Sequence, residues 1–415
     1  MLRALEWIKR NKSYFKNFLK ILIATSASQL ILISATPFLS RIYSTSDFGA
    51  QGVLFSVVSI LTFLSTLRYE NILIIERREK PIFLFTLVLK LLLRSTICIF
   101  LLLLAFNSII PGLIGLGSDN KNLLFFIPVI LFFNSLYDLF ILYKNRLNDF
   151  NFISKLKVSQ SLVSSTSQLI LGTFGTGALG LILGPVISKA SLTIKSLPIN
   201  RLFSRFTEKE KSLFKFHYKF PIYDVPNNLI NTIIQYIPIL FFGAYNKIEL
   251  SGAYFMSMRI IQSPVSILSH SILEVYKSKI SEITSYDLRK KVFYDTTALI
   301  LILTLLPFAF SFFYVEEILI YFLGESWYYT AAFTKILLPS LYLKLYSYPL
   351  SYIIISKNKQ NVSLYINFIT ISFIAIALLL NKNLLPTEFV QLVNIVFCFK
   401  SIVIIAYSAY LIHRK

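Results

Sequence analysis

The sequence has few charged residues, and acidic ones are especially scarce. Only 15% of its 415 residues are charged, and 20 Asp and Glu stand against 41 Lys and Arg, a net charge of +21. Soluble domains have roughly a quarter of their residues charged, so a mean hydropathy of +0.67 excludes an ordinary water-soluble fold. In nucleic-acid-binding proteins the basic residues form stripes on a soluble face. Here they interrupt long apolar runs, which indicates a membrane protein and no nucleic-acid partner.

Cysteine and histidine are also scarce, which excludes several kinds of chemistry. The two cysteines, Cys98 and Cys398, lie in apolar runs, so neither a disulfide framework nor a CxxC site is expected. The three histidines, His217, His270 and His413, are far apart and have no metal-ligand spacing. We therefore expect no metal and no cofactor.

Apolar runs that can cross a bilayer, about 20 residues each, occur twelve times between polar breaks. They lie at approximately 21–40, 51–75, 82–110, 123–143, 158–175, 178–197, 221–243, 252–273, 292–314, 331–355, 361–380 and 388–411. The glycines of Gly172–Gly180 fit either a tight reversal between the fifth and sixth runs or a mobile break in one longer segment. The sequence predicts an all-α integral membrane protein of about 12 transmembrane helices.

The distribution of Lys and Arg predicts the orientation, because basic loops stay in the cytoplasm. With the amino terminus inside, the outer loops hold only four basic residues, Arg41, Lys121, Lys247 and Lys382. Both termini are then cytoplasmic. The basic start resembles a signal peptide, but the run at 21–39 is too long and lacks a cleavage site, so we expect it to remain as the first helix. No loop has room for a folded extramembrane domain, so the function must lie within the bundle.

A weak internal repeat divides the chain. Pro37–Gly49 resembles Pro238–Gly252: each has a proline near the end of an odd-numbered run, then a tyrosine, an acid and a closing glycine. Many transporters consist of repeated halves with a cleft between them. We expect an N-terminal lobe at 1–197, a cytoplasmic linker at 198–219 and a C-terminal lobe at 220–415.

Charged residues inside the apolar runs are mostly cations. These cations are Arg68, Lys90, Arg94, Lys189, Lys195, Arg259, Lys335, Lys344 and Lys400. The acids are only Glu70, Asp138 and Asp295, with Asp224 near an edge. Ionisable groups in a membrane are costly and normally face a cavity or a partner. The surplus cations are therefore hydrated, reach the interface, or match an anionic substrate.

Two arginines occupy the same place in each half. Arg68 and Arg259 both lie in the second run of their half, and arginine suits bidentate phosphate recognition. Lys90 and Arg94 are four residues apart on one face of the third run; they either face a cavity or pair with Asp138. Structural ion pairing is the alternative for all four cations.

Several segments resemble a known family. Phe220–Asn231 (FPIYDVPNNLIN), Tyr236–Tyr254, Met258–Tyr276 and Phe322–Trp327 (FLGESW) are similar to second-half signatures of Wzx-type polysaccharide biosynthesis proteins, the lipid-linked oligosaccharide flippases. Pro37–Gly49, Thr66–Glu70 (TLRYE) and Gly177–Gly184 (GALGLILG) resemble that family's first half. The resemblance runs along essentially the whole chain.

This resemblance implies membership of the multidrug/oligosaccharidyl-lipid/polysaccharide exporter superfamily, with two six-helix lobes in a MATE-like arrangement around a central cavity. It implies a transporter, not an enzyme: a flippase in the bacterial inner membrane that moves an undecaprenyl-diphosphate-linked oligosaccharide from the cytoplasmic to the periplasmic leaflet by alternating access. The product would be O-antigen or a related surface polysaccharide. The implied partners are a polysaccharide polymerase and a chain-length regulator.

The same resemblance suggests roles for individual residues. It places Arg68 and Arg259 where diphosphate contacts are expected. Our own hypothesis adds Lys90 and Arg94 as assisting cations. Arg41, in the LSRIY motif, is a site residue or an interfacial anchor. Candidate sites for proton or sodium coupling are Glu70, Asp138 and Asp295, although structural pairing explains each equally well.

Other functions fit the sequence less well. A cation-coupled multidrug exporter of the same fold would need a cleft rich in acids, and a flippase for the peptidoglycan precursor usually has two extra helices. A membrane polymerase or glycosyltransferase needs catalytic carboxylates or a large outer loop, but the longest outer loop, Val315–Thr330, holds only Glu316, Glu317 and Glu325. The identity of the sugars and the energy source stay open.

Overall fold

A computed structural model of the chain describes residues 12–116, 118–194, 197, 202–283, 285–357, 359–380 and 385–413. Over these residues the chain forms helices and no strand, which confirms the all-α expectation. Among the described helices, seven are long and apolar enough to cross a membrane. The expected number of twelve is compatible with this, because each of the twelve apolar runs overlaps a separate helix.

The chain divides into two compact units, Met1–Leu229 with Gly243–Asn246, and Ile230–Phe242 with Lys247–Lys415. Unit 1 contains the helices α2 (Lys12–Ile42), α3 (Thr45–Thr66), α4 (Ile72–Ile75), α5 (Pro81–Ala105), α6 (Ile110–Ile114), α7 (Ile127–Arg146), α8 (Phe150–Thr173), α9 (Ala178–Thr193) and α11 (Glu208–Phe216). It also has the 3₁₀ turns η1 (Tyr69–Asn71) and η2 (Ser118–Phe126) and the π-helical turn η4 (Phe220–Asp224).

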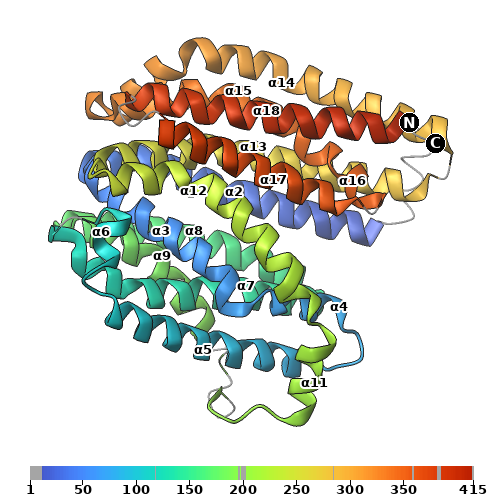
Figure 1. Cartoon of the computed structure of the whole chain (residues 1–415), viewed down its shortest axis with the longest axis horizontal. Helices are drawn as coiled ribbons and strands as arrows, with labels where there is room; N and C mark the ends of the chain where they lie inside the picture. Colours follow the sequence, from blue (N-terminus) through green and yellow to red (C-terminus); the bar gives the residue numbers. More distant parts are fainter. Residues whose placement is uncertain are drawn as a thin grey trace. The chain divides into compact units, whose positions relative to one another are not determined.

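Unit 2 holds the later helices, which are drawn from yellow to red in Figure 1. They are α13 (Ile248–Glu282), α14 (Tyr286–Leu323), α15 (Tyr328–Leu350), α16 (Tyr352–Ser356), α17 (Gln360–Leu380) and α18 (Pro386–His413), with the turn η5 (Glu325–Trp327). The helix α12 (Val225–Ala244) contributes its residues 230–242 to unit 2 and its ends to unit 1.

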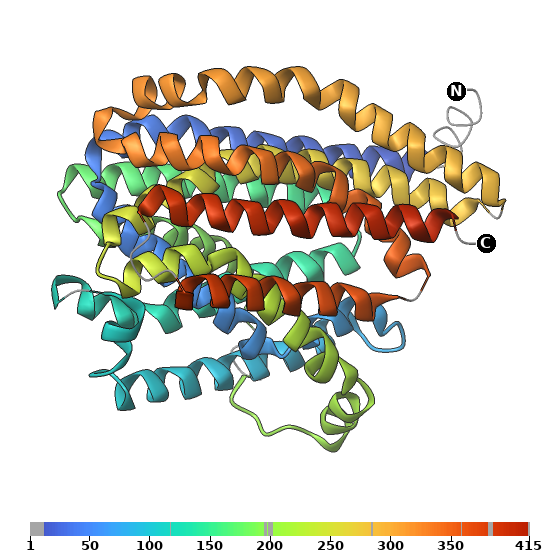
Figure 2. The ribbon, with the colours of Figure 1, turned by 45° about the horizontal axis from the view of Figure 1, so that its top comes forward.

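The central helices of the two units have corresponding neighbours. In unit 1, α7 is central and packs on α3, α5 and α9, while α8 packs on α9. In unit 2, α15 is central and packs on α13, α14 and α18, while α17 packs on α18. The helices α15 and α18 run side by side in both ribbon views (Figure 1 and Figure 2). By order along the chain and by contacts, α15 and α18 of unit 2 therefore correspond to α7 and α9 of unit 1.

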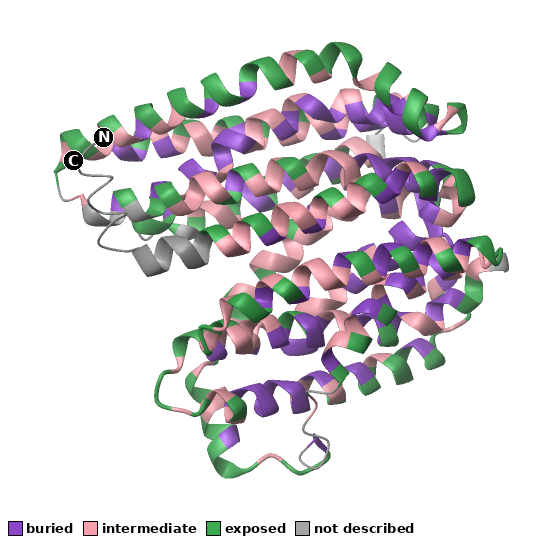
Figure 3. Ribbon diagram, turned by 180° about the vertical axis from the view of Figure 1, so that it is seen from behind, coloured by how far each residue is buried: buried purple, intermediate pink, exposed green. Residues whose placement is uncertain are grey.

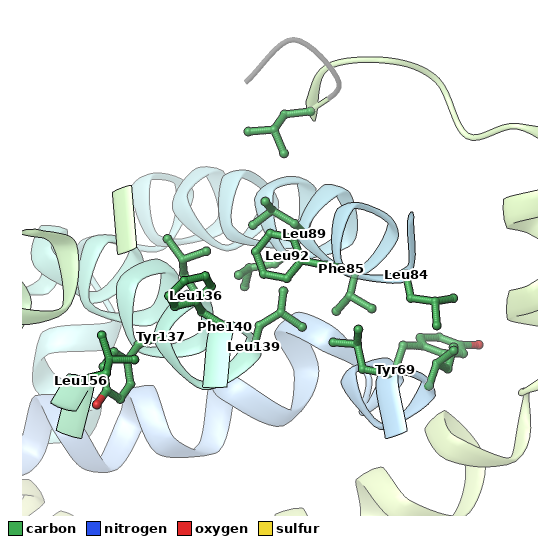
Figure 4. Packing of buried hydrophobic residues seen from close by; sticks show 14 residues of the cluster. Tyr69, Leu84, Phe85, Leu89, Leu92, Leu136, Tyr137, Leu139, Phe140 and Leu156 are labelled. Carbon is green, nitrogen blue, oxygen red and sulfur yellow. The ribbon is translucent and has the colours of Figure 1, made fainter. Parts of the chain in front are cut away.

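The core of unit 1 forms between α5 and α7. Phe85, Leu89 and Leu92 of α5 face Leu136 and Phe140 of α7 (Figure 4). All five side chains are buried. Lipid is as apolar as leucine, so helices in a membrane associate through close packing and hydrogen bonds and not through the hydrophobic effect. The close packing of α5 on α7 holds α7 in place, and α7 lines the candidate site described below.

The central helix of unit 2 is buried, while its neighbour α14 is largely exposed (Figure 3). Exposed side chains of α14 include Ile302, Leu306, Phe313 and Tyr321. Large apolar side chains on the outside of a helix of 38 residues are suited to contact with lipid. The chain is thus a multi-pass membrane protein.

The fifth and sixth apolar runs are separate helices joined by a tight turn. Between α8 and α9, Gly175 and Gly177 have φ of 67° and 55°, values that favour glycine. The expected reversal is confirmed, and a single longer helix is excluded. Within α9, Pro185 has no N–H for the carbonyl of Leu181, and the amides of Gln51 and Gln168 donate to that oxygen instead, at 2.7 and 2.8 Å.

The tightest backbone approach in unit 1 predicts one stability effect. Gly115 has φ of 72°, and the backbone carbonyl of Gly243 occupies the place where its side chain would be. Gly115→Ala should destabilise the protein by more than the left-handed penalty of about 1–2 kcal/mol, measured as the thermal midpoint in detergent. Gly112→Ala is the matched control, because open space surrounds that position. Equal midpoints for the two variants would contradict this packing.

Candidate functional site

The second apolar run is interrupted at Arg68. The structure ends α3 at Thr66, and Leu67 and Arg68 then adopt left-handed conformations with φ of 49° and 62°. The expectation of one continuous helix over 51–75 was therefore wrong. The hydroxyl of Ser95 donates to the carbonyl of Ser65 at 2.6 Å, which satisfies a group freed by the break. Consecutive left-handed residues other than glycine are costly and concentrate at functional sites.

A cavity lies directly at this break. It has a volume of about 380 Å³ and is lined by the end of α3, by η1 and by α7. We call it the Arg68 pocket. Its lining residues are Thr62, Phe63, Thr66, Arg68, Glu70, Asn71, Ser135, Asp138, Leu139, Ile141 and Leu142. The structure thus brings together three of the predicted site residues, Arg68, Glu70 and Asp138.

Arg68 and Glu70 form an open ion pair in the pocket. Their side chains are 3.1 Å apart and are 27% and 16% exposed. Arg68 Nε and Glu70 Oε2 are buried and have no hydrogen-bond partner among the described residues. Buried polar atoms are rarely left unsatisfied. This arrangement leaves donor and acceptor capacity for an incoming ligand or a proton.

Cations of the neighbouring helices act on the charge of Asp138. The cations that act on it are Lys189 of α9 and Lys157 of α8. Lys189 Nζ donates to Asn134 Oδ1 at 2.8 Å, and Lys157 Nζ donates to Thr25 Oγ1 at 3.0 Å. Asp138 itself is exposed to the pocket. Two carboxylates, those of Glu70 and Asp138, therefore line one cavity.

Lys90 and Arg94 lie on α5 and contact the linker. Lys90 Nζ is 2.8 Å from Glu210 of α11, and both side chains are at most 5% exposed. Arg94 donates to the carbonyl of Ser204 at 2.9 Å and stacks on the ring of Phe206 at 3.9 Å. Of the two alternatives that the sequence left open, pairing of these cations with Asp138 is absent among the described residues. The predicted role of both cations in substrate binding stays a prediction.

Helix α11 was missed from the sequence, although a signal for it is present. Thr207 and Glu210 form a capping box, in which each side chain binds the other residue's backbone N–H, at 3.3 and 2.7 Å. The pattern Thr-x-x-Glu marks the start of a helix. A second ion pair, Lys209–Glu79 at 2.8 Å, also connects α11 to unit 1. The helix of the expected linker is thus fixed to unit 1.

The remaining predicted residues lie elsewhere. Arg41 is exposed at the end of α2, in a shallow apolar groove with Phe38 and Ile170. Arg259 is half-buried in α13, and Asp295 is exposed on α14. Lys195 lies outside the described residues. Over the described chain, no three His, Cys, Asp or Glu side chains form a group that could hold a metal ion.

Comparison with known proteins places this fold. A sequence profile described as "Polysaccharide biosynthesis protein" matches residues 38–332. The chain belongs to the polysaccharide biosynthesis protein family. No curated protein sequence matches it.

Solved structures share the fold of this polysaccharide biosynthesis protein. The lipid II flippase MurJ, in an inward closed conformation, aligns with a TM-score of 0.73 and 15% identity, over 93% of this chain and 86% of that chain. A mutant of the MATE transporter VcmN of Vibrio cholerae aligns with a TM-score of 0.62 and 11% identity, over 96% of each chain. An inward-facing multidrug MATE transporter aligns at 0.60, with 14% identity over 94% of each chain. The fold is therefore that of flippases and transporters.

The buried pair of α5 and α11 predicts a large stability effect. Lys90→Ala leaves the carboxylate of Glu210 buried without its partner, which typically costs about 3–5 kcal/mol. We expect a marked fall in the thermal midpoint. Lys211→Ala is the control, because Lys211 pairs with Glu208 on the exposed face of the same helix, where a pair contributes about 0–1 kcal/mol. Similar effects of the two variants would argue against a structural Lys90–Glu210 pair.

The same pair predicts sensitivity to acid. Burial acts to raise the pKa of Glu210, but hydrogen bonds from Lys90 and from the Thr207 backbone outweigh it and hold the pKa below its usual value of 4.5. A lowered pKa stabilises the folded state above the unfolded-state value, and this contribution is lost as the pH falls through the folded-state value. Stability measured from pH 6 down to about pH 3 should fall more steeply in the wild type than in Glu210→Gln. Parallel curves would contradict the lowered pKa.

Proposed function

We propose that this membrane protein flips an undecaprenyl-diphosphate-linked oligosaccharide repeat unit from the cytoplasmic to the periplasmic leaflet by alternating access, for O-antigen or a related surface polysaccharide. The Arg68 pocket carries the proposal: a guanidinium stands at a helix break, in a cavity, beside two carboxylates. Family membership and the flippase and transporter fold support it.

Arginine in a membrane cavity is suited to a diphosphate. Moving a diphosphate and a polar glycan through hydrocarbon is prohibitive, whereas a planar guanidinium binds phosphate oxygens in bidentate fashion. Arg68 is partly exposed and its present partner is a single carboxylate oxygen. A doubly charged diphosphate can displace that oxygen. Lys90 is closed against Glu210, so a ligand would have to break a buried pair to reach it.

The two carboxylates offer a means of coupling to protons. When a phosphate takes Arg68, Glu70 loses its cation and remains beside the charge of Asp138. The two carboxylates are then candidates for binding a proton or a sodium ion. Such binding and substrate binding would promote each other, because this kind of linkage is reciprocal. Asp295 on α14 is a second candidate for ion coupling, and Arg259 of α13 is the expected diphosphate contact in the second half.

The same proposed function implies a cellular location, an orientation in the membrane and partner proteins. We place the protein in the bacterial inner membrane with both termini in the cytoplasm, because its basic loops fall on one side. Arg41 then lies at the outer surface. A polymerase and a chain-length regulator would act on the delivered repeat units. A cation-coupled multidrug exporter is the second candidate, since carboxylates line the pocket and MATE transporters share the fold.

The test is the sidedness of the repeat unit in cells. Cells lacking the protein are given the wild type, Arg68→Ala, Arg259→Ala, or Lys155→Ala, which removes an exposed cation of α8. We expect the repeat unit to accumulate on the cytoplasmic side without the protein and with either arginine variant. A hydrogen bond to a charged group contributes about 1.5–3 kcal/mol, so Arg68→Ala should slow flipping by about 10–100-fold. Lys155→Ala should behave as wild type.

Three results would count against this function. Repeat units that reach the outer leaflet but stay unpolymerised in cells lacking the protein would indicate a polymerase. Normal flipping by Arg68→Ala, at normal protein levels, would remove the Arg68 pocket from the pathway. Export of cationic drugs, with no change in the repeat unit, would favour the multidrug exporter.

A further inference from the structure

The two units differ in charge at equivalent helices. In unit 1 the central helix α7 has Asp138 and the neighbouring α9 has Lys189, so the pair has opposite signs. In unit 2 the equivalent helices, α15 and α18, have Lys344 and Lys400. The backbone N–H of Ser340 in α15 donates to Asn394 Oδ1 of α18 at 3.2 Å, and Lys344 and Lys400 follow this contact by four and six residues. The charge of Lys344 acts on Lys400. The repeat thus has an acid and a base in one copy and two bases in the other.

No acid compensates the two lysines in the described part of unit 2. Both side chains are half-buried, and no carboxylate is among the groups that act on either. Lys400 Nζ donates to the side-chain oxygen of Asn231 on α12, at 3.1 Å. Lys344 has no hydrogen bond or ion pair within the described residues. A neutral amide oxygen cannot balance two positive charges.

We propose that Lys344 and Lys400, with the amide of Asn231, form an anion-binding site in unit 2 for a phosphate or carboxylate group. Two half-buried ammonium groups on neighbouring membrane helices repel each other, and an anion bound by both stabilises them. The side-chain N–H₂ of Asn231 is a further donor for that anion, since its oxygen already accepts from Lys400. The two lysines lie beyond residues 38–332, the segment that the family profile matches, whereas Asn231 lies within it.

The anion has two sources, and they share the same chemistry. It is either a charged group of the transported lipid-linked oligosaccharide, which rests on the function proposed above, or a free inorganic anion. In the first case the site binds the substrate at a second position, in addition to the Arg68 pocket. In the second it is a structural anion site, independent of transport.

The first experiment measures binding to the purified full-length protein in detergent. Inorganic phosphate is titrated against chloride at constant ionic strength, and the thermal midpoint is followed. We expect phosphate to stabilise the wild type, and Lys344→Met and Lys400→Met each to weaken the apparent affinity at least tenfold. Lys247→Met, which removes an exposed cation at the start of α13, should leave the affinity unchanged. Equal responses of all three variants would overturn the site.

A second readout does not depend on binding. Without phosphate, Lys344→Met should raise the thermal midpoint, because it removes the repulsion of Lys400 and fills the same space with an apolar chain. Lys344→Arg keeps the charge and should keep both the lower midpoint and the response to phosphate. A lower midpoint for Lys344→Met than for Lys344→Arg would contradict the uncompensated pair.

Flipping in cells separates the two sources. If the substrate supplies the anion, Lys344→Met and Lys400→Met reduce flipping at least tenfold while Lys247→Met does not. If phosphate binds through both lysines but all three variants flip normally, a free anion occupies the site. If Arg68→Ala abolishes flipping and phosphate has no effect on the wild type, the anion site fails while the proposed function stands. If phosphate binds through both lysines but the wild type does not flip the repeat unit, the proposed function fails while the anion site stands.

Discussion

A charged side chain within a membrane-crossing helix must find an opposite charge, a hydrogen bond or water, because it otherwise costs a few kcal/mol or more. Unit 1 meets this constraint by placing opposite charges on neighbouring elements: Lys90 forms an ion pair with Glu210, and the charge of Lys189 acts on Asp138. Each pair joins segments that are distant in sequence. Charge compensation therefore also determines packing, since it holds α11 on α5 and supports the contact of α7 with α9.

The same constraint distinguishes a closed ion pair from an open one. Lys90 is 5% exposed and forms a short pair with Glu210. Arg68 is more exposed, its pair with Glu70 is longer, and its Nε lacks a described partner. Its backbone also adopts a costly left-handed conformation. A closed, well-compensated pair stabilises the fold, whereas an open pair on a strained backbone retains the capacity to exchange partners, which binding and release require.

Much of the helical architecture could be predicted from the sequence, because an apolar run that spans a bilayer can only be a helix. The turn at Gly175 and Gly177 was predictable for a similar reason, since glycine favours positive φ. The break at Leu67 and Arg68 was not, because neither residue disfavours a helix and tertiary packing imposes their conformation. The partner of Lys90 was also hidden: Glu210 lies 120 residues away, in a segment that was expected to be only a linker.

Unequal charge in two equivalent helix pairs has a consequence for transport. In the proposed mechanism, an anion at Arg68 would compete with Glu70, a carboxylate of the protein itself, which would weaken its binding and assist its release. An anion at Lys344 and Lys400 has no such competitor among the described residues, and its loss restores the repulsion between two lysines. If two sites bind the same anionic group with different affinities, the group favours the tighter site. The size of that preference is the difference between the two binding free energies. The central helix of unit 1 has Asp138, whereas the equivalent helix of unit 2 has Lys344. This difference in charge makes the two copies of a repeated fold unequal in their affinity for anions.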